Sequence, residues 1–198
     1  MKSISIILLA AGGSSRLGRP KQLLQFEGTT LVQRALDAAL EAKPKQVVVV
    51  EGAHRGLAEK SNTAIVVENK DWQEGIASSI RSGLNTVLEY EPGTDAVIFM
   101  VCDQPYVTGE LLKEIMTAHE SSGKDIVASS YAGTVGIPAL FSKSYFDALR
   151  QLKGDEGAKK IILKNTDGVA LVDFPKGNID IDTAGDYATL QGKDIPPV

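Results

Sequence analysis

The chain has 198 residues, of which 43% are hydrophobic and 23% are charged, the mix of an ordinary soluble globular domain. Its formal net charge of −4 argues against a nucleic-acid-binding domain, and its single cysteine excludes a disulfide within the chain. Since no apolar run approaches the roughly 20 residues that span a bilayer, we predict a cytoplasmic protein with neither a membrane nor a nucleic-acid partner.

Apolar runs alternate with helical patterns along the chain. The predicted strands cover residues 4–10, 46–51, 64–67, 95–101, 125–129, 138–141, 169–172 and 178–181. The predicted helices cover residues 30–42, 57–61, 78–89, 109–121, 143–151, 158–164 and 183–190. Strands separated by helices of this length predict an α/β fold of three layers, with a mostly parallel sheet between two layers of helices. We expect one domain over residues 1–190 and a loosely held tail over residues 191–198.

A glycine-rich loop follows the first predicted strand and reads LAAGGSSRLGRPK over residues 9–21. Small residues let the backbone approach a ligand closely, and successive backbone N–H groups form a concave anion site. Arg16 and Lys21 add charge-assisted donors for phosphate oxygens. The loop therefore predicts a polyphosphate cradle at the carboxyl edge of the sheet, where such sheets bind their ligands.

Two better-known phosphate motifs do not fit this loop. A Walker A loop needs Gly-Lys-Ser/Thr, but Gly18 is followed by Arg19 and Pro20. A dinucleotide fingerprint needs G-x-G-x-x-G, which Gly12, Gly13 and Gly18 do not form. The spacing thus disfavours both a P-loop NTPase and a dehydrogenase.

Six segments together resemble one family. Residues 9–24 are similar to the signature of the MobA-like NTP transferases, and within that group to molybdenum cofactor cytidylyltransferases of the MocA type. Further segments match in order: NKDWQEGIASSIRSGL (69–84), VCDQP (101–105), GTVGIPALF (133–141), GDEGAKKII (154–162) and IDIDTAGDY (179–187). The resemblance implies a single Rossmann-like domain of the nucleotide-diphospho-sugar transferase type. It also implies a nucleotidyltransferase that moves CMP from CTP to the phosphate of molybdopterin and releases pyrophosphate.

The resemblance carries nucleotide-binding roles onto the glycine loop and onto the helix that begins near residue 78. The residues concerned are Leu9, Ala10, Ala11, Gly12, Gly13, Ser14, Arg16, Lys21, Ser78 and Ser79. From the residues alone, the two serines are equally suited to capping a helix. The resemblance places this segment against the base and ribose, with Ser79 as the better candidate for direct contact. In the family, Leu-Ala-Ala-Gly goes with cytosine and Leu-Ala-Gly-Gly with guanine, so the resemblance favours CTP over GTP.

Nucleotidyl transfer requires charge neutralisation and positioning more than a strong base, because a phosphate acceptor is already ionised. By resemblance, Asp103 and Asp182 hold Mg²⁺, and Lys21, Arg16 and Asp103 are the catalytic residues. The residues alone leave both carboxylates open to structural roles, with Asp182 as an N-cap of the last helix. Asp180 and Asp182 alternate along a predicted strand, so at most one of them is expected to face the site.

The acceptor side is expected around Gly136, Pro138, Gly157 and Lys159, with a molybdopterin-type acceptor and with a molybdoenzyme or its insertion chaperone as a candidate partner. The sequence departs from the family at three positions: Ile137 replaces a frequent histidine, Lys159 a frequent arginine and Ala184 a frequent proline. Three alternatives stay open: the same chemistry on another phosphorylated acceptor, the same chemistry with GTP, and a non-catalytic chaperone for a molybdoenzyme.

Overall fold

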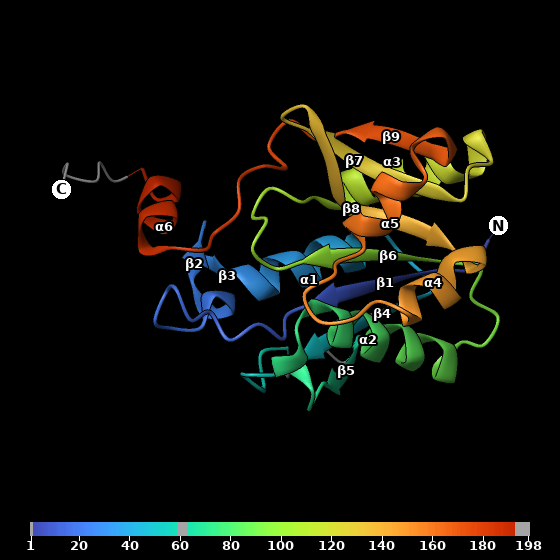
Figure 1. Ribbon diagram of the computed structural model, residues 1–198. Coiled ribbons are helices and arrows are strands. Elements are labelled where there is room, and N and C mark those ends of the chain that lie inside the picture. Colours follow the sequence, from blue (N-terminus) through green and yellow to red (C-terminus); the bar gives the residue numbers. More distant parts are fainter. Residues whose placement is uncertain (1, 59–62, 193–198) are drawn as a thin grey trace.

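The computed structural model describes residues 2–58 and 63–192 and contains one seven-stranded sheet (Figure 1). The sheet order is β5-β4-β1-β6-β8-β7-β9. The strands are β1 (Ile4–Leu9), β4 (Gln46–Glu51), β5 (Ile65–Glu68), β6 (Ala96–Val101), β7 (Ile126–Tyr131), β8 (Thr134–Ser142) and β9 (Val169–Asp173). Every neighbouring pair is parallel except those that involve β8, which confirms the mostly parallel sheet.

The central strands are continuously apolar because both faces of the sheet are covered. All six residues of β1 are buried, and their side chains alternate between two hydrophobic cores. Ile6 and Leu8 belong to one core, whereas Ile7 and Leu9 belong to the other. The strand therefore separates two packed layers, as its unbroken apolar sequence predicts.

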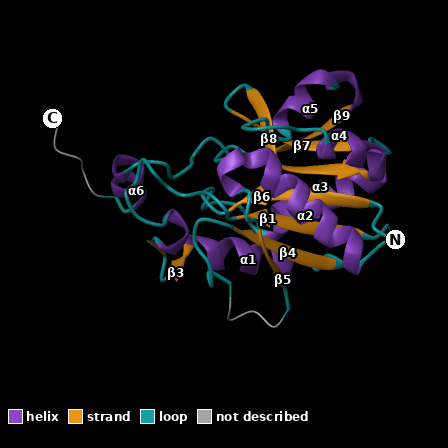
Figure 2. Cartoon of the chain, turned by 60° about the horizontal axis from the view of Figure 1, so that its bottom comes forward, coloured by secondary structure: helices purple, strands orange, loops and turns teal. Residues whose placement is uncertain are grey.

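Helices cover both faces of the sheet (Figures 1 and 2). The first core packs α1 (Leu31–Glu41) and α3 (Gly109–Ser122) against one face. The second core packs α2 (Ile76–Tyr90), α4 (Phe146–Arg150) and α5 (Lys159–Lys164) against the other. The predicted three-layer α/β/α arrangement is therefore confirmed. Of the helices in the described ranges, none is long and apolar enough to cross a membrane.

The reversed strand β8 brings the acceptor-side segment to the carboxyl end of β6. Phe99 of β6 pairs with Ala139 of β8 in antiparallel register. Because the chain runs in opposite directions, the residues after Phe99 approach those before Ala139. Gly136 and Ile137 therefore lie next to the end of β6, although they are remote from it in sequence.

The C-terminal segment packs on a small third core beside the sheet. The hairpin of β2 (Gln25–Phe26) and β3 (Thr29–Thr30) lies next to α6 (Ala184–Leu190) in Figure 1. Leu24, Phe26, Leu31 and Ile181 form this core, and Tyr187 packs against it. This contact joins the end of the described chain to the region just after the glycine loop.

Three details differ from the sequence-based expectations. Residues 178–181 form no strand but an irregular segment, in which the Ile179 N–H donates to the Lys176 carbonyl and the Ile181 N–H donates to the Asp103 carbonyl. In the predicted helix 57–61, Leu57 and Ala58 form a bend, and residues 59–61 lie outside the described residues. The predicted helix 143–151 is a 3-10 turn (Lys143–Tyr145) followed by α4. Residues 191–192 form a turn, and the rest of the predicted tail lies outside the described residues.

Candidate nucleotide-binding and catalytic site

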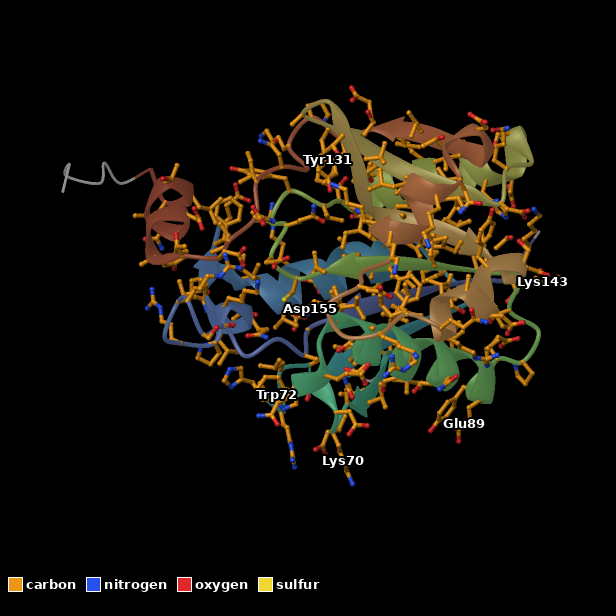
Figure 3. The ribbon with its side chains drawn as sticks, viewed as in Figure 1. Lys70, Trp72, Glu89, Tyr131, Lys143 and Asp155 are labelled. Atoms are coloured by element: carbon orange, nitrogen blue, oxygen red, sulfur yellow. The ribbon has the colours of Figure 1, made fainter. Side chains whose placement is uncertain are left out.

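A cavity of about 340 Å³ opens at the carboxyl ends of β1 and β6. Figure 3 shows Trp72, Asp155 and Tyr131 at this end of the molecule, whereas Lys143 lies at the opposite end. Eight of the predicted site residues line the cavity: Leu9, Ala10, Ala11, Gly12, Gly13, Lys21, Ser79 and Asp103. Ser14, Arg16, Ser78 and Asp182 do not line it. The tertiary structure thus gathers most of the predicted nucleotide and catalytic residues, and their roles stay predictions.

The glycine loop is folded around one buried side chain, Gln22, which the sequence analysis did not identify. Only 1% of Gln22 is exposed, and its Nε2 donates to the carbonyls of Ala10 (2.9 Å) and Gly12 (2.8 Å). Ser14 supports the loop as well, since its Oγ accepts a hydrogen bond from the Lys21 N–H at 3.0 Å. A buried amide that pairs two loop carbonyls holds the loop in one shape. Because the partners of this amide are backbone carbonyls, no pattern of side chains in the sequence indicates the role of Gln22.

Trp72, in the 3-10 turn η2 (Trp72–Glu74), packs against the loop and also lines the cavity. A Cβ atom at Gly13 would lie 3.1 Å from the indole ring, and one at Gly52 would lie 2.8 Å from the Ala11 Cβ. Glycine at these positions therefore permits the close packing of loop, indole and strand end. Trp72 therefore packs against the loop and also borders the cavity.

An ion cluster joins the glycine loop, the end of β6 and the C-terminal segment. The Lys21 Nζ lies 2.5 Å from Asp103 Oδ2 and 3.0 Å from Asp182 Oδ1, and Arg16 donates to Asp182 Oδ2 at 2.8 Å. Burial alone would lower the pKa of Lys21, but the two carboxylates outweigh it and raise that pKa above its usual value. Burial opposes the ionisation of Asp182, yet Lys21 and Arg16 lower its pKa overall. Lys21 and Asp182 are therefore both charged near neutral pH.

The two carboxylates fit a hard divalent cation. Asp103 Oδ1 is buried and has no hydrogen-bond partner, so one oxygen remains for a ligand. Among the described residues, no group of three or more His, Cys, Asp and Glu side chains is placed to hold a metal. A metal here would thus depend on Asp103 and Asp182 together with phosphate and water oxygens, which is the usual environment of Mg²⁺.

Asp182 is not the N-cap of the last helix. Thr183 caps α6 and forms a capping box with Asp186. A second expectation concerned Asp180, which strand alternation placed on the face opposite to Asp182. Residues 178–181 form no strand, so that alternation does not apply. Burial and the charges of Asp182 and Asp103 raise the pKa of Asp180, which lines a neighbouring cavity.

The two predicted serines of α2 differ in their surroundings. Both are buried, and the Asn69 Nδ2 donates to the Oγ atoms of Ser78 (2.8 Å) and Ser79 (3.0 Å). Ser78 donates in turn to the carbonyl of Gly75, which is the N-cap residue of α2. Ser79 lines the cavity, and Ser78 does not. The geometry therefore leaves Ser79 as the better-placed ligand contact of the two.

Three of the four predicted acceptor residues share a smaller cavity. Gly136, Gly157 and Lys159 line a space of about 190 Å³ with Tyr131 and Ile137. Pro138 does not line this cavity. The residue is buried, and its backbone carbonyl accepts a hydrogen bond from Ser129 Oγ at 2.7 Å.

Asp155, from the same loop as Gly157, lines the first cavity instead. Gly75 makes room for it, because a Cβ there would lie 2.5 Å from Asp155 Oδ1. The loop that was expected on the acceptor side therefore borders both cavities.

Cys102 and His119 have structural surroundings. Burial, with a contribution from Asp103, raises the pKa of Cys102 to about 12, so its thiol stays protonated. His119 is buried, and its Nδ1 lies 2.7 Å from the carbonyl of Lys124. Among the described residues, the ion cluster at the cavity therefore consists of cations and carboxylates and includes neither of these two side chains.

Residues 6–169 match the family model described as the MobA-like NTP transferase domain. The purine catabolism protein PucB of Bacillus subtilis is 28% identical over 91% of this chain and 92% of its own length. The molybdenum cofactor cytidylyltransferase of Escherichia coli is 24% identical over 96% of this chain and 97% of its own. Nicotine blue oxidoreductase of Paenarthrobacter nicotinovorans is 28% identical over 89% and 91%.

Solved structures agree with the fold over the whole chain. The crystal structure of Rv0371c from Mycobacterium tuberculosis superposes with a TM-score of 0.83 at 30% identity and covers 97% of this chain and 99% of that one. A structure of the same protein in complex with manganese has a TM-score of 0.78 at 29% identity and covers 98% and 100%.

Proposed function

The chain belongs to the MobA-like NTP transferase family, and we propose that it transfers CMP from CTP to the phosphate of a molybdopterin-type acceptor, with release of pyrophosphate. The family makes the chain a nucleotidyltransferase. The proposal adds the base, the acceptor and a dependence on Mg²⁺, and we also propose that the protein works in the cytoplasm.

One observation carries the proposal: Lys21 lies between the carboxylates of Asp103 and Asp182, beside a cavity that the glycine loop lines. Transfer requires an oxygen of the acceptor phosphate to bond to the α-phosphorus of CTP while the bond from that phosphorus to the bridging oxygen breaks. Negative charge then accumulates on the leaving pyrophosphate. The described cluster holds the cations and carboxylates that such a reaction needs within one edge of the sheet.

Each side chain has a role in this scheme. Lys21 neutralises charge on the transferred phosphoryl group, and Arg16, which is mostly exposed, reaches the outer phosphates. Asp103 and Asp182 would hold Mg²⁺, which supplies Lewis-acid stabilisation of phosphoryl oxygens when it is bound. The acceptor phosphate is already ionised, so the protein needs no strong base.

Ala11 supports the choice of CTP. Ala11 is 4% exposed, lines the cavity and lies against Gly52. A methyl group at this position takes space that the larger purine would need. The residue pattern of the family points in the same direction, and a relative of this length is named as a cytidylyltransferase.

The acceptor has competing assignments, because relatives of similar identity carry different names. PucB is named for purine catabolism and another relative for the oxidation or reduction of nicotine blue. The same transfer to another phosphorylated acceptor, or a chaperone role for a molybdoenzyme, are the competing proposals. Retention of Lys21, Asp103 and Asp182 favours catalysis over simple binding.

Nucleotide binding is the first test, and the single tryptophan makes it simple. Trp72 lines the cavity, so its fluorescence reports occupancy. We expect CTP to bind with Mg²⁺ and to bind weakly without it, and GTP, ATP and UTP to bind less tightly. Pyrophosphate release should then require a molybdopterin acceptor. Binding of no nucleotide would overturn the proposal, and a preference for GTP would overturn the base.

Ala11→Gly tests the base assignment directly. Removing one methyl group from the cavity should raise the ratio of GTP to CTP use by about 10-fold to 200-fold, the range for one methyl or methylene group in an apolar pocket. Ala132→Gly, in the exposed turn between β7 and β8, is the control and should leave the ratio unchanged. A ratio that does not move in Ala11→Gly would mean that Ala11 does not set base preference.

A further inference from the structure

Two groups of elements line the nucleotide cavity. The glycine loop and the end of β6 contribute Lys21 and Asp103, and a second wall comes from η2, the start of α2 and the loop that follows α4. This second wall consists of Trp72, Gln73, Gly75, Ile76, Ser79 and Asp155. Figure 3 shows Asp155 and Trp72 at the same end of the molecule. Asp155 is the carboxylate of this wall, and the nucleotidyl transfer proposed above assigns it no role.

Hydrogen bonds fix the loop that carries Asp155 to the start of α2. The Ala77 N–H donates to the Gly154 carbonyl at 3.1 Å, and Arg81 Nη1 donates to the Leu152 carbonyl at 2.6 Å. Both carbonyls belong to residues that come just before Asp155 in the chain. Because the loop is bound at two points, the backbone at Asp155 keeps one place relative to α2.

Gly75, the N-cap residue of α2, allows this loop to approach the helix closely. A Cβ atom at Gly75 would lie 2.5 Å from the Gly154 carbonyl oxygen and 2.5 Å from Asp155 Oδ1. The residue also has a φ of +119°, which glycine adopts far more readily than other residues. The Asp155 carboxylate therefore lies against the α2 N-cap. Ser79, about one turn further along the helix, lines the same cavity.

The surroundings of Asp155 differ from those of two glutamates nearby. Glu74 forms an ion pair with Arg81, and Glu156 forms one with Lys160. Within the part of the chain that the structure describes, no cation forms an ion pair with Asp155. Asp155 therefore borders the cavity as a carboxylate that no neighbouring side chain neutralises.

A carboxylate of this kind prefers one half of a nucleotide to the other. It accepts hydrogen bonds and repels phosphate groups, so the triphosphate is favoured beside Lys21 and Arg16 instead. The nucleoside half carries the hydrogen-bond donors, which are the ribose hydroxyls and, on cytosine, guanine and adenine, an exocyclic amino group. Asp155 therefore matches the nucleoside half, and its charge favours one direction of the nucleotide in the cavity.

We propose that Asp155 is a specificity-determining residue for the nucleotide, and that its carboxylate accepts a hydrogen bond from the nucleoside half. The donor is an exocyclic amino group of the base or a hydroxyl of the ribose. The inference rests on the proposed function for the identity of the ligand in this cavity. It also gives the loop two tasks, because Gly157 of the same loop lines the cavity expected to hold the acceptor.

The test compares three nucleotides on the full chain in the presence of Mg²⁺, with binding measured by calorimetry. UTP has a carbonyl oxygen where CTP has its amino group, and 2′,3′-dideoxy-CTP lacks both ribose hydroxyls. We expect CTP to bind at least about tenfold more tightly than one of these analogues, because that analogue leaves the carboxylate without its donor. If GTP binds better than CTP, then GTP, ITP and 2′,3′-dideoxy-GTP form the equivalent set.

Asp155→Asn removes the charge and keeps the shape of the side chain. The residue is exposed, so the variant should fold. It should reduce the preference that the carboxylate sets by at least about threefold, because a hydrogen bond to a neutral amide is weaker than one to a carboxylate. Asp147→Asn, which replaces an 88% exposed aspartate on α4, is the matched control and should keep the full preference.

The outcomes separate this inference from the proposed function. A reduced preference over UTP or ITP in Asp155→Asn would support the inference and identify the donor as the amino group. A reduced preference over the dideoxy analogue would support it and identify the ribose.

Two results would overturn the inference while CTP binding still supports the proposed function. One is a wild type that binds all three nucleotides equally. The other is Asp155→Asn with both preferences unchanged, even if it binds every nucleotide more weakly, because the carboxylate would then only hold the loop. A wild type that binds no nucleotide would overturn both proposals.

Discussion

Asp103 has two different oxygens, and this difference decides what its replacement should do. Oδ2 pairs with Lys21, whereas Oδ1 is buried without a partner. Asp103 also lines two adjoining cavities of about 340 Å³ each, the one bordered by the glycine loop and the one that Asp180 lines. No other described residue lines both cavities except Val101, which has no polar side-chain atom.

Asp103→Asn should reduce pyrophosphate release by on the order of 1,000-fold or more while the protein stays folded. The variant lacks the charge that would hold a metal, and metal stabilisation of phosphoryl oxygens is worth several kcal/mol. It keeps an oxygen that can accept from Lys21, and it relieves repulsion with Asp180. Turnover and thermal unfolding are measured together, with Asp147→Asn as the control. Normal turnover in Asp103→Asn would show that the metal assignment is wrong.

At the scale of elements, the glycine loop owes its shape to the turn that follows it. The segment η1 (Lys21–Leu23) places Lys21 toward the ion cluster and Gln22 toward the loop carbonyls. Of these two adjacent residues, one contributes a charge to the site and the other holds the conformation of the loop. The Gln22 amide acts on the loop together with Ser14 and with the packing of Trp72 against Gly13.

Gln22→Leu should lower the free energy of unfolding by about 1–3 kcal/mol, because it leaves two loop carbonyls without their donor. It should also weaken CTP binding, since the loop no longer presents its N–H groups in one arrangement. Urea unfolding and Trp72 fluorescence measure the two effects. Gln33→Leu, which removes only a hydrogen bond to Asp37 on the outer face of α1, is the control. Unchanged CTP affinity in Gln22→Leu would mean that the loop does not depend on this brace.

At the scale of the whole molecule, contacts between distant segments close the site. Arg16 and Asp182 are 166 positions apart in sequence, yet they form an ion pair. Tyr187 strengthens the same connection, because its hydroxyl donates to the Gln25 carbonyl at 2.9 Å and Arg19 lies over its ring. The C-terminal segment thus holds the cationic loop in place from outside the sheet.

Tyr187→Ala should lower kcat/KM for CTP by on the order of tenfold, because the loop that positions the phosphates loses its support. The unfolding temperature should change little, since α6 packs on the small third core and not on the sheet. Tyr187→Phe keeps the ring over Arg19 and loses only the two hydrogen bonds of the hydroxyl, to the Gln25 carbonyl and from Gln191 Nε2, so it should have a smaller effect. If Tyr187→Ala has the same kcat/KM as the wild type, α6 does not support the site.

Much of this molecule was predictable because its signals are local. Buried parallel strands need continuous apolar runs, so β1, β4 and β6 were visible in the sequence. The glycine loop and the aspartate after β6 were visible because each follows such a strand. The edge of the sheet that should bind a ligand followed from the same pattern.

Only the tertiary structure decided the rest, because those features depend on pairs of residues that are remote in the chain. The segment 178–181 has strand-like alternation but no neighbouring strand to complete a ladder, so it is irregular and Asp180 turns toward the site. Nothing in the sequence distinguishes Gln22 and Gln104 from other polar residues. Their roles come from hydrogen bonds that their amides donate to backbone carbonyls remote in the chain. The sequence alone determined the fold class and the edge at which chemistry occurs, since local periodicity and small residues encode both. The pairing of Lys21 with two carboxylates, and the cavities around them, required the folded chain to bring four segments together.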